Sequence, residues 1–156
     1  MRYGLIGWPL GHSISPQLHR RLAGVEYELR PLPEAEFEAF MAARDFAAVN
    51  VTIPYKRRVL PYCAQLTPAA RRCGSVNLLI KGRDGTLTGD NTDLAGLEFL
   101  LRQNGWVLTG QTVVILGSGG TGHTAKAAAE ELGAAEIATV SRTGELNYEN
   151  LAERYG

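Results

Sequence analysis

The stretch TVVILGSGGTGHTAKAAAEEL, residues 112–132, decides the fold of the C-terminal part of the chain. Its first residues form a β-branched apolar run, which predicts a strand, and the alanine-rich segment 121–132 predicts a helix. The loop between them matches the pattern G-x-G-x-x-G and consists of Gly117, Ser118, Gly119, Gly120, Thr121 and Gly122. Because a helix N-terminus attracts anions, this strand, loop and helix together predict a pyrophosphate-binding site.

The glycine loop has two other interpretations. A tight strand-to-helix turn without any ligand has the same glycines, and this interpretation stays open. The phosphate loop of kinases and ATPases needs a lysine where this chain has His123, and a neutral imidazole supplies no permanent cation. Triphosphate chemistry is therefore disfavoured.

The residues that follow the next predicted strand, 136–141, bear on the choice of dinucleotide. In dinucleotide-binding folds, an acidic residue about 20 positions after the glycines binds a ribose hydroxyl, whereas an arginine accommodates a 2′-phosphate. Here the strand ends in Ser141, Arg142 and Thr143, and no carboxylate occurs before Glu145. The segment favours NADP over NAD as the cofactor, although a solvated arginine at a strand end is the simpler alternative.

Strands and helices also alternate through the preceding hundred residues. Strands are predicted at 3–7, 26–30 and 47–54, helices at 16–23, from Pro33, from Thr67-Pro68 to Gly74 and from 92 to Gly105, and a hairpin turns at Arg83-Asp84-Gly85. Ser15 is the predicted N-cap of the first helix, with Pro16 at its first position. This alternation predicts an α/β protein with mainly parallel sheets. The turn-rich segment 104–111 suggests domains of 1–104 and 105–156.

Composition argues for a small-molecule partner. Sixteen basic residues balance sixteen acidic ones, so the net charge is +0, and the arginine pairs are scattered, which favours neither nucleic acid nor a membrane surface. No apolar run approaches a membrane span, and no signal-peptide pattern follows Met1, so a cytoplasmic location is expected. Cys63 and Cys73 lack metal or redox spacing, and the histidines form no ligand pattern, so no metal is expected.

Polar side chains gather where strands of the predicted sheet end. They lie in three segments: Ser13 with Ser15, Asn50 through Lys56, and Asp90 through Asp93. Hydroxyls at a helix N-terminus suit a carboxylate, amides suit hydroxyl groups, and a lysine with an aspartate suits proton transfer. This inventory predicts a polyhydroxylated carboxylic acid as the ligand. For Ser15 taken alone, helix capping explains the residue equally well.

Several of these segments together resemble the shikimate dehydrogenase family. The resemblance covers essentially the whole chain and rests on GWPLGHSISPQLH (7–19), NVTIPYK (50–56), CGSVN (73–77), GDNTDLAG (89–96), GSGGTG (117–122) and SRT (141–143). It implies the reversible, NADPH-dependent reduction of 3-dehydroshikimate to shikimate, a step of aromatic amino-acid biosynthesis. A quinate preference or a substrate-binding module that lacks turnover are the alternatives.

The resemblance also assigns roles to residues. Lys56 and Asp93 are implied as the catalytic pair, and Ser13, Ser15 and Thr52 as the residues that hold the substrate carboxylate. Asn77 and Asp93 are implied to bind the ring hydroxyls, and Asn50 is expected to contact substrate from the same polar segment as Thr52.

Two features depart from the family pattern. Leu78 follows Asn77 where the family has threonine, which removes a hydroxyl near the expected site. Residues 117–156 suffice for only about one βαβ unit of roughly 30 residues, so a truncated Rossmann-like unit is expected. The chain is then either a fragment or a short product that folds by association, and the unpaired strand edges predict self-association.

Overall fold

Strand β1 (Tyr3–Gly7) is the strand around which the first sheet is built. It pairs in parallel with β2 (Glu28–Pro31) on one side and with β3 (Ala48–Val51) on the other. In the computed structural model, which describes residues 1–156, the sheet has six strands in the order β2-β1-β3-β5-β6-β4. Strands β5 (Leu78–Lys81) and β6 (Leu87–Asp90) form the predicted hairpin, and β4 (Gln65–Leu66) pairs in parallel with β6. Most neighbouring strands are parallel, so the predicted α/β class is confirmed.

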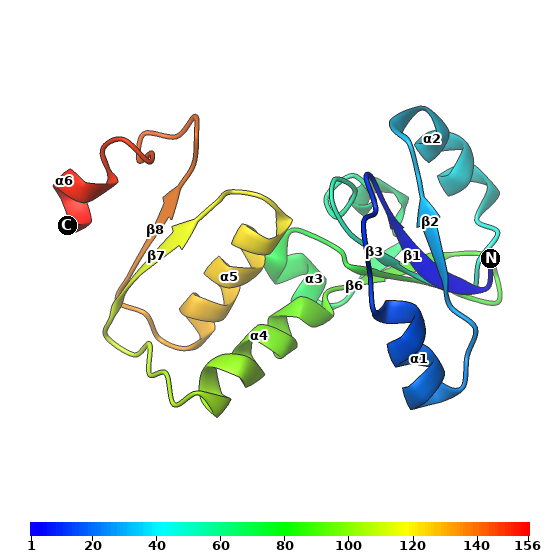
Figure 1. The fold of residues 1–156 in the computed structure, drawn as a ribbon, viewed down its shortest axis with the longest axis horizontal. Helices are drawn as coiled ribbons and strands as arrows, with labels where there is room; N and C mark the ends of the chain where they lie inside the picture. Colours follow the sequence, from blue (N-terminus) through cyan, green and yellow to red (C-terminus); the bar gives the residue numbers. More distant parts are fainter. The chain divides into compact units, whose positions relative to one another are not determined.

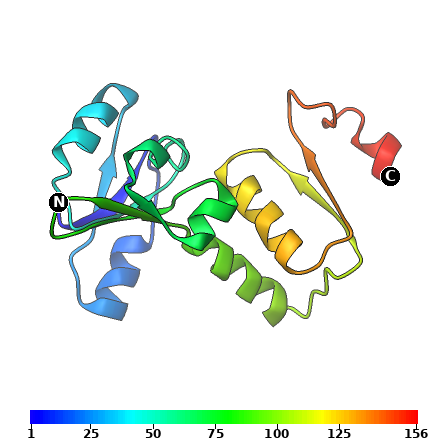
Figure 2. The same cartoon turned by 180° about the vertical axis from the view of Figure 1, so that it is seen from behind.

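Helices α1 (Ser15–Ala23) and α2 (Glu34–Ala43) connect the first three strands. They lie on opposite sides of these strands, as Figures 1 and 2 show. A short 3-10 helix, η1 (Leu60–Tyr62), and helix α3 (Pro68–Cys73) lead into the hairpin. The hydroxyl of Thr67 accepts a hydrogen bond from the Ala70 N–H (3.2 Å), so the predicted start of α3 is confirmed.

The predicted N-cap of α1 is wrong. Ser15 is the first residue of the helix, Ile14 occupies the cap position, and no side chain caps the helix there. The hydroxyl of Ser13 instead accepts a hydrogen bond from the Ser15 N–H at 3.2 Å. Because a serine can bond to the backbone two residues ahead, Ser13 forms this local turn and shifts the helix start by one residue.

The core of the first unit packs between the sheet and its connections. Its largest fully buried side chains include Tyr55, Phe37, Ile6, Leu32, Met41 and Leu79. Phe37 stacks on Tyr55 with ring centroids 4.5 Å apart, and the guanidinium of Arg58 lies 4.5 Å from the Phe37 ring. The 3.6-residue spacing of α2 therefore buries Phe37 and Met41 under the sheet.

The second compact unit contains a two-stranded parallel sheet. It comprises α4 (Thr92–Gln103), β7 (Thr112–Leu116), α5 (Gly120–Glu131), β8 (Glu136–Val140) and α6 (Leu151–Tyr155). Helix α4 packs against α5, and α5 contacts both strands (Figures 1 and 2). This unit has the predicted truncated Rossmann-like order of strand, helix and strand.

Contacts between elements, and not only their order in the sequence, define the two units. The first unit comprises Met1–Arg71 with Ser75–Asn91, and the second comprises Arg72–Gly74 with Thr92–Gly156. Helix α4 thus groups with the second unit, although the sequence suggested a boundary after residue 104. The contact of α4 with α5 is the physical reason, and this contact joins segments that a loop separates in sequence.

No helix combines the length and the apolar character that crossing a bilayer requires. The structure also brings together no group of three or more His, Cys, Asp or Glu side chains suited to a metal ion.

Replacing Phe37 by alanine tests the core. Phe37 is 0% exposed, so Phe37→Ala should destabilise the first unit by about 3–5 kcal/mol through lost burial and an unfilled cavity. Phe99, which is 65% exposed, provides the control, and Phe99→Ala should change stability by about 0.5 kcal/mol or less. Urea unfolding measures both variants, and equal effects would contradict this description of the core.

Candidate functional site

The carboxyl ends of β1 and β3 form the edge of the first unit at which the candidate site lies. The Thr52 N–H donates to the Ile6 carbonyl and the Trp8 N–H donates to the Ile53 carbonyl, each at 2.9 Å. These bonds hold the two chain segments side by side as they leave the sheet. The Thr52 methyl group lies so close to Gly7 that a side chain at that position would overlap it. The predicted substrate residue Thr52 is therefore packed directly against the end of β1.

The two predicted carboxylate-binding serines lie together at the start of α1. The Ser13 and Ser15 hydroxyl oxygens are 3.0 Å apart, and both side chains are partly exposed. Two adjacent hydroxyls at a helix N-terminus can donate to the same anion while the helix dipole favours negative charge there. The structure thus brings this predicted pair together.

Hydrogen bonds also connect the two predicted amide residues, Asn50 and Asn77. The Asn50 side chain donates to the Asn77 carbonyl at 3.3 Å, and the same carbonyl accepts from the Val51 N–H at 2.8 Å. The Asn77 N–H donates to the Asp90 carbonyl at 2.9 Å, and Asn77 is buried. Asn50 lies in β3 and Asn77 directly precedes the neighbouring strand β5, so these backbone bonds hold the two residues in fixed register.

Lys56 lies in the loop that follows β3, and its side chain is half-buried. Its carbonyl accepts a hydrogen bond from the Val76 N–H at 2.8 Å, which ties the lysine loop to the segment that contains Asn77. The same segment is held at Ser75, whose carbonyl accepts a buried hydrogen bond from the Asn91 side-chain amide at 3.0 Å. The first unit therefore contains Lys56 together with the serines, Thr52 and both amides.

Asp93 belongs to the second unit, where it lies in the first turn of α4. Asp93 is half-buried, and a helix N-terminus favours negative charge at this place. Burial is the main cause that raises the pKa of the nearby Cys73 thiol, and the Asp93 carboxylate raises this pKa further.

The glycine loop of the second unit has the geometry of an anion-binding turn. Gly117 has a φ of 121°, a conformation that side chains rarely adopt, and its N–H donates to the Val140 carbonyl at 2.8 Å. A side chain at Gly122 would overlap the Gly117 carbonyl oxygen, whereas the space around Gly119 is open. The loop therefore passes close to α5 while its middle stays accessible, which fits a pyrophosphate group.

The other predicted cofactor residues follow β8. Ser141 is half-buried and its N–H donates to the Leu146 carbonyl at 3.1 Å, while Arg142 and Thr143 are exposed. Because β7 and β8 are parallel, the glycine loop and this segment leave the sheet at the same edge. The structure thus brings the predicted pyrophosphate and 2′-phosphate residues to one side of the second unit.

Two residues that the sequence analysis did not single out connect the candidate site. His19 lies four residues after Ser15 and its Nδ1 is 2.9 Å from the Ser15 carbonyl oxygen. Its ring stacks on Tyr27 with centroids 4.0 Å apart, and the Tyr27 hydroxyl donates to the Asn50 side chain at 2.7 Å. The i,i+4 spacing on α1 could have identified His19. No local pattern points to Tyr27.

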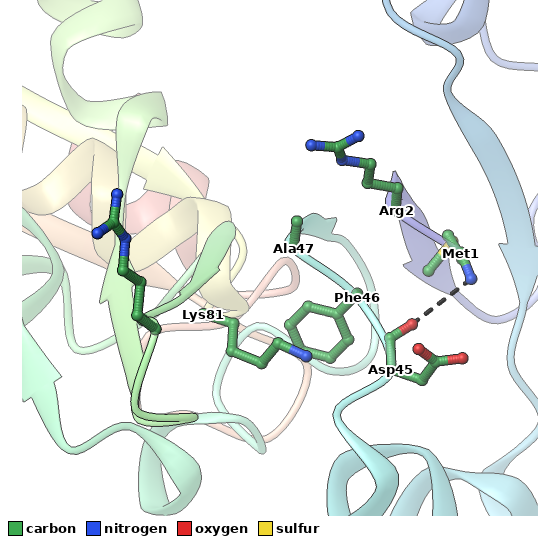
Figure 3. Close-up of a pocket in the computed structure, with 8 residues that line it drawn as sticks. Met1, Arg2, Asp45, Phe46, Ala47 and Lys81 are labelled. Carbon is green, nitrogen blue, oxygen red and sulfur yellow. Dashed lines mark hydrogen bonds between the residues drawn. The ribbon is translucent and has the colours of Figure 1, made fainter.

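A hollow of about 470 Å³ in the first unit lies away from these residues. Figure 3 shows it lined by Met1, Arg2, Asp45, Phe46, Ala47 and Lys81, with the Met1 ammonium bonded to the Asp45 carbonyl at 3.5 Å. These residues lie at the amino ends of β1 and β3. The hollow is therefore at the opposite end of the strands from the serines and amides.

Comparison with known proteins points to one family. Residues 5–79 match the family described as the shikimate dehydrogenase substrate binding domain. The chain is 38% identical over 149 residues to a shikimate dehydrogenase (NADP(+)) of Halothermothrix orenii, covering 90% of this chain and 51% of that protein. It is 40% identical over 149 residues to the enzyme of the same name from Rhodospirillum rubrum, covering 89% and 53%.

Solved structures agree with this finding. Shikimate dehydrogenase 1 from Peptoclostridium difficile superposes with a TM-score of 0.89 at 29% identity, covering 97% of this chain and 63% of that one. The Thermus thermophilus enzyme, solved in complex with NADP(H) and shikimate, gives a TM-score of 0.78 at 33% identity, covering 92% and 56%.

The chain spans about half the length of these curated relatives, as the 51% and 53% coverages state. The similarity nevertheless extends beyond the substrate-binding domain into the glycine loop and β8, because it covers 97% of this chain in the Peptoclostridium structure. The chain is therefore similar to shikimate dehydrogenases over nearly its whole length, and its residues 5–79 are a shikimate dehydrogenase substrate-binding domain.

Proposed function

We propose that this chain carries the substrate-binding part of an NADP-dependent shikimate dehydrogenase, which reduces 3-dehydroshikimate to shikimate reversibly. The observation that carries the proposal is the grouping of the serine pair, Thr52 and Asn77 on segments that leave one sheet edge. Relatives of similar sequence are named shikimate dehydrogenase (NADP(+)), and one similar structure was solved in complex with NADP(H) and shikimate.

The chemistry of the first unit suits shikimate. In this proposal Ser13, Ser15 and Thr52 donate hydrogen bonds to the substrate carboxylate, and α1 adds the partial positive charge of its N-terminus. The amide of Asn77 would bind the ring hydroxyls, and Asp93, which belongs to the second unit, is proposed for the same role. The substrate is thereby held by its two chemically different ends, which orients the ring.

The glycine loop and Arg142 fit the cofactor. When bound, NADPH supplies the hydride that reduces the substrate carbonyl. The Gly117–Gly122 loop would hold its pyrophosphate, and the exposed Arg142 guanidinium would pair with the 2′-phosphate.

Proton transfer is assigned to Lys56 and Asp93. A lysine ammonium can donate a proton to the oxygen that gains charge as the carbonyl is reduced, and in the reverse direction the amine accepts it. The Asp93 carboxylate is proposed to accept a hydrogen bond from the reacting hydroxyl and so to orient it.

A second candidate function is a shikimate-binding module without turnover. The observation that favours it is that the serine pair, Thr52, Lys56 and both amides all lie in the first unit, whereas the glycine loop lies in the second. Mixing the chain with shikimate and NADP⁺ and following the absorbance of reduced nicotinamide separates the two. Shikimate binding by calorimetry without turnover would favour the module, and a parallel titration with quinate tests the substrate preference.

Lys56→Ala should lower any turnover by at least about 100-fold, because a positioned proton donor contributes typically 10²–10⁴ to a rate. Lys126→Ala is the matched control, since Lys126 is an exposed lysine of α5 outside the proposed site. Absorbance assays at saturating substrate measure both variants, with thermal unfolding as the check on folding. A folded Lys56→Ala variant with unchanged turnover would contradict the role of Lys56.

Arg142→Asp should weaken NADP binding far more than NAD binding. A carboxylate at this position repels the 2′-phosphate, yet it can accept a hydrogen bond from the ribose hydroxyl of NAD. Calorimetric titration of both dinucleotides measures the effect, and Arg102→Asp, at an exposed residue of α4, is the charge control. If the variant lost affinity equally for NADP and NAD, Arg142 would have only a structural role.

We also propose that two copies of the chain associate through their second units. We further propose that the protein is located in the cytoplasm. Both strands of the β7–β8 sheet have an unpaired edge. Beside β7 lies a hollow of about 450 Å³ with apolar walls, formed by Val114, Leu116, Tyr148, Leu151, Ala152 and Tyr155. The location is supported by the two cysteines, which are free thiols as expected in a reducing compartment.

Sedimentation at micromolar concentration should therefore detect a dimer or a larger assembly. Leu116 lies in the hollow and is 64% exposed, so Leu116→Lys should shift the chain toward monomer without unfolding it. Val107→Lys, at a side chain that is 73% exposed outside the hollow, should leave the assembly unchanged. A wild-type chain that sediments as a monomer would refute the association.

A further inference from the structure

Helix α1 carries the serine pair without being anchored by buried side chains. None of its residues is buried, and its apolar residues Leu18 and Leu22 are exposed. Hydrophobic packing therefore contributes little to where this helix lies, since a helix is normally held by an apolar face on the core. Another contact must define the position of Ser13 and Ser15.

The stack of His19 on Tyr27 provides such a contact. The rings are nearly parallel, with an interplanar angle of 17° and centroids 4.0 Å apart, and both side chains are half-buried. His19 is also linked to the backbone of Ser15, because its Nδ1 lies 2.9 Å from the Ser15 carbonyl oxygen. Tyr27 thus holds the start of α1 through one intermediate side chain.

The hydroxyl of Tyr27 reaches the other half of the candidate site. It donates to the Oδ1 of Asn50 at 2.7 Å, and the amide nitrogen of Asn50 donates to the Asn77 carbonyl at 3.3 Å. Asn50 therefore uses both ends of its side chain on protein partners. Its geometry suits a bridge between Tyr27 and Asn77 better than a direct substrate contact.

We propose that Tyr27 is a positioning residue that sets the spacing between the carboxylate-binding serines of α1 and the hydroxyl-binding Asn77. This inference rests on the proposed function, because the spacing matters only for a ligand that spans both groups. The ring of Tyr27 fixes the serine side through His19, and its hydroxyl fixes the amide side through Asn50. Burial raises the pKa of Tyr27 to about 12, so the phenol remains a neutral donor at physiological pH.

Two variants separate the two contacts. Tyr27→Phe keeps the ring stack and removes the hydroxyl, so it should weaken shikimate binding about tenfold by leaving Asn50 without its donor. It should not change the affinity for cyclohex-1-ene-1-carboxylate, which has the carboxylate but no ring hydroxyls. His19→Ala removes the stack, and it should weaken the binding of both ligands.

Calorimetry measures shikimate binding, and NMR titration measures the weaker cyclohexene carboxylate. In the ligand-free chain, Tyr27→Phe should shift the Asn77 amide resonance and His19→Ala should shift that of Ser15. Tyr62→Phe is the matched control, because it removes another phenol hydroxyl whose partner, Glu38, lies outside the site. It should leave all these quantities unchanged.

The inference is overturned if Tyr27→Phe binds shikimate as tightly as the wild type, or if it loses affinity for both ligands equally. If the wild-type chain does not bind shikimate, the proposed function fails, and the ligand-free spectra then decide about Tyr27. Shifts of Asn77 and Ser15 in their respective variants would support the two links, and unmoved resonances would refute them.

Discussion

The hydrogen bond from the Thr52 N–H to the Ile6 carbonyl, 2.9 Å long, joins β1 and β3 where both strands end. The serine loop leaves the sheet from one of these strands and the Thr52–Lys56 loop leaves from the other. Ile6 pairs with Val51, and these side chains are 0% and 2% exposed. If either strand slipped by one residue, its own buried side chain would turn toward the opposite face, so burial of the core fixes the register. The register in turn decides which polar residues meet at the edge.

The second unit repeats this constraint with different residues. Leu116 pairs with Val140, and the bond from the Gly117 N–H to the Val140 carbonyl extends the ladder into the glycine loop. In this unit too, the residues proposed to bind a ligand directly follow the last paired residues of two parallel strands. Backbone groups beyond the last pair no longer satisfy one another, and those of the glycine loop become available to an anion.

Features with a local physical cause could be predicted from the sequence. The glycine loop, the hairpin turn at Arg83-Asp84-Gly85 and the threonine start of α3 each depend on a few adjacent residues, and the structure contains them. Strand β4 could not be predicted, because it has only two residues and exists through its pairing with β6. Ser15 does not cap α1, because the Ser13 hydroxyl accepts the Ser15 N–H and the helix begins at Ser15 itself. Tyr27 has no sequence signal, since its relation to Asn50 arises only when β2 and β3 flank β1.

Apolar burial holds one part of the candidate site in place, and polar contacts hold the other part. Backbone hydrogen bonds in or directly beside the strands place Thr52, Asn50 and Asn77, and the buried core supports these strands. The serines depend on a helix with no buried residue, tied to the sheet by a ring stack and hydrogen bonds. A carboxylate bound between the two serines would add interactions to the less firmly anchored of these parts. A ligand that binds only when α1 is in place stabilises that position of the helix. The affinity for a carboxylate ligand therefore depends on how firmly α1 is held before the ligand binds.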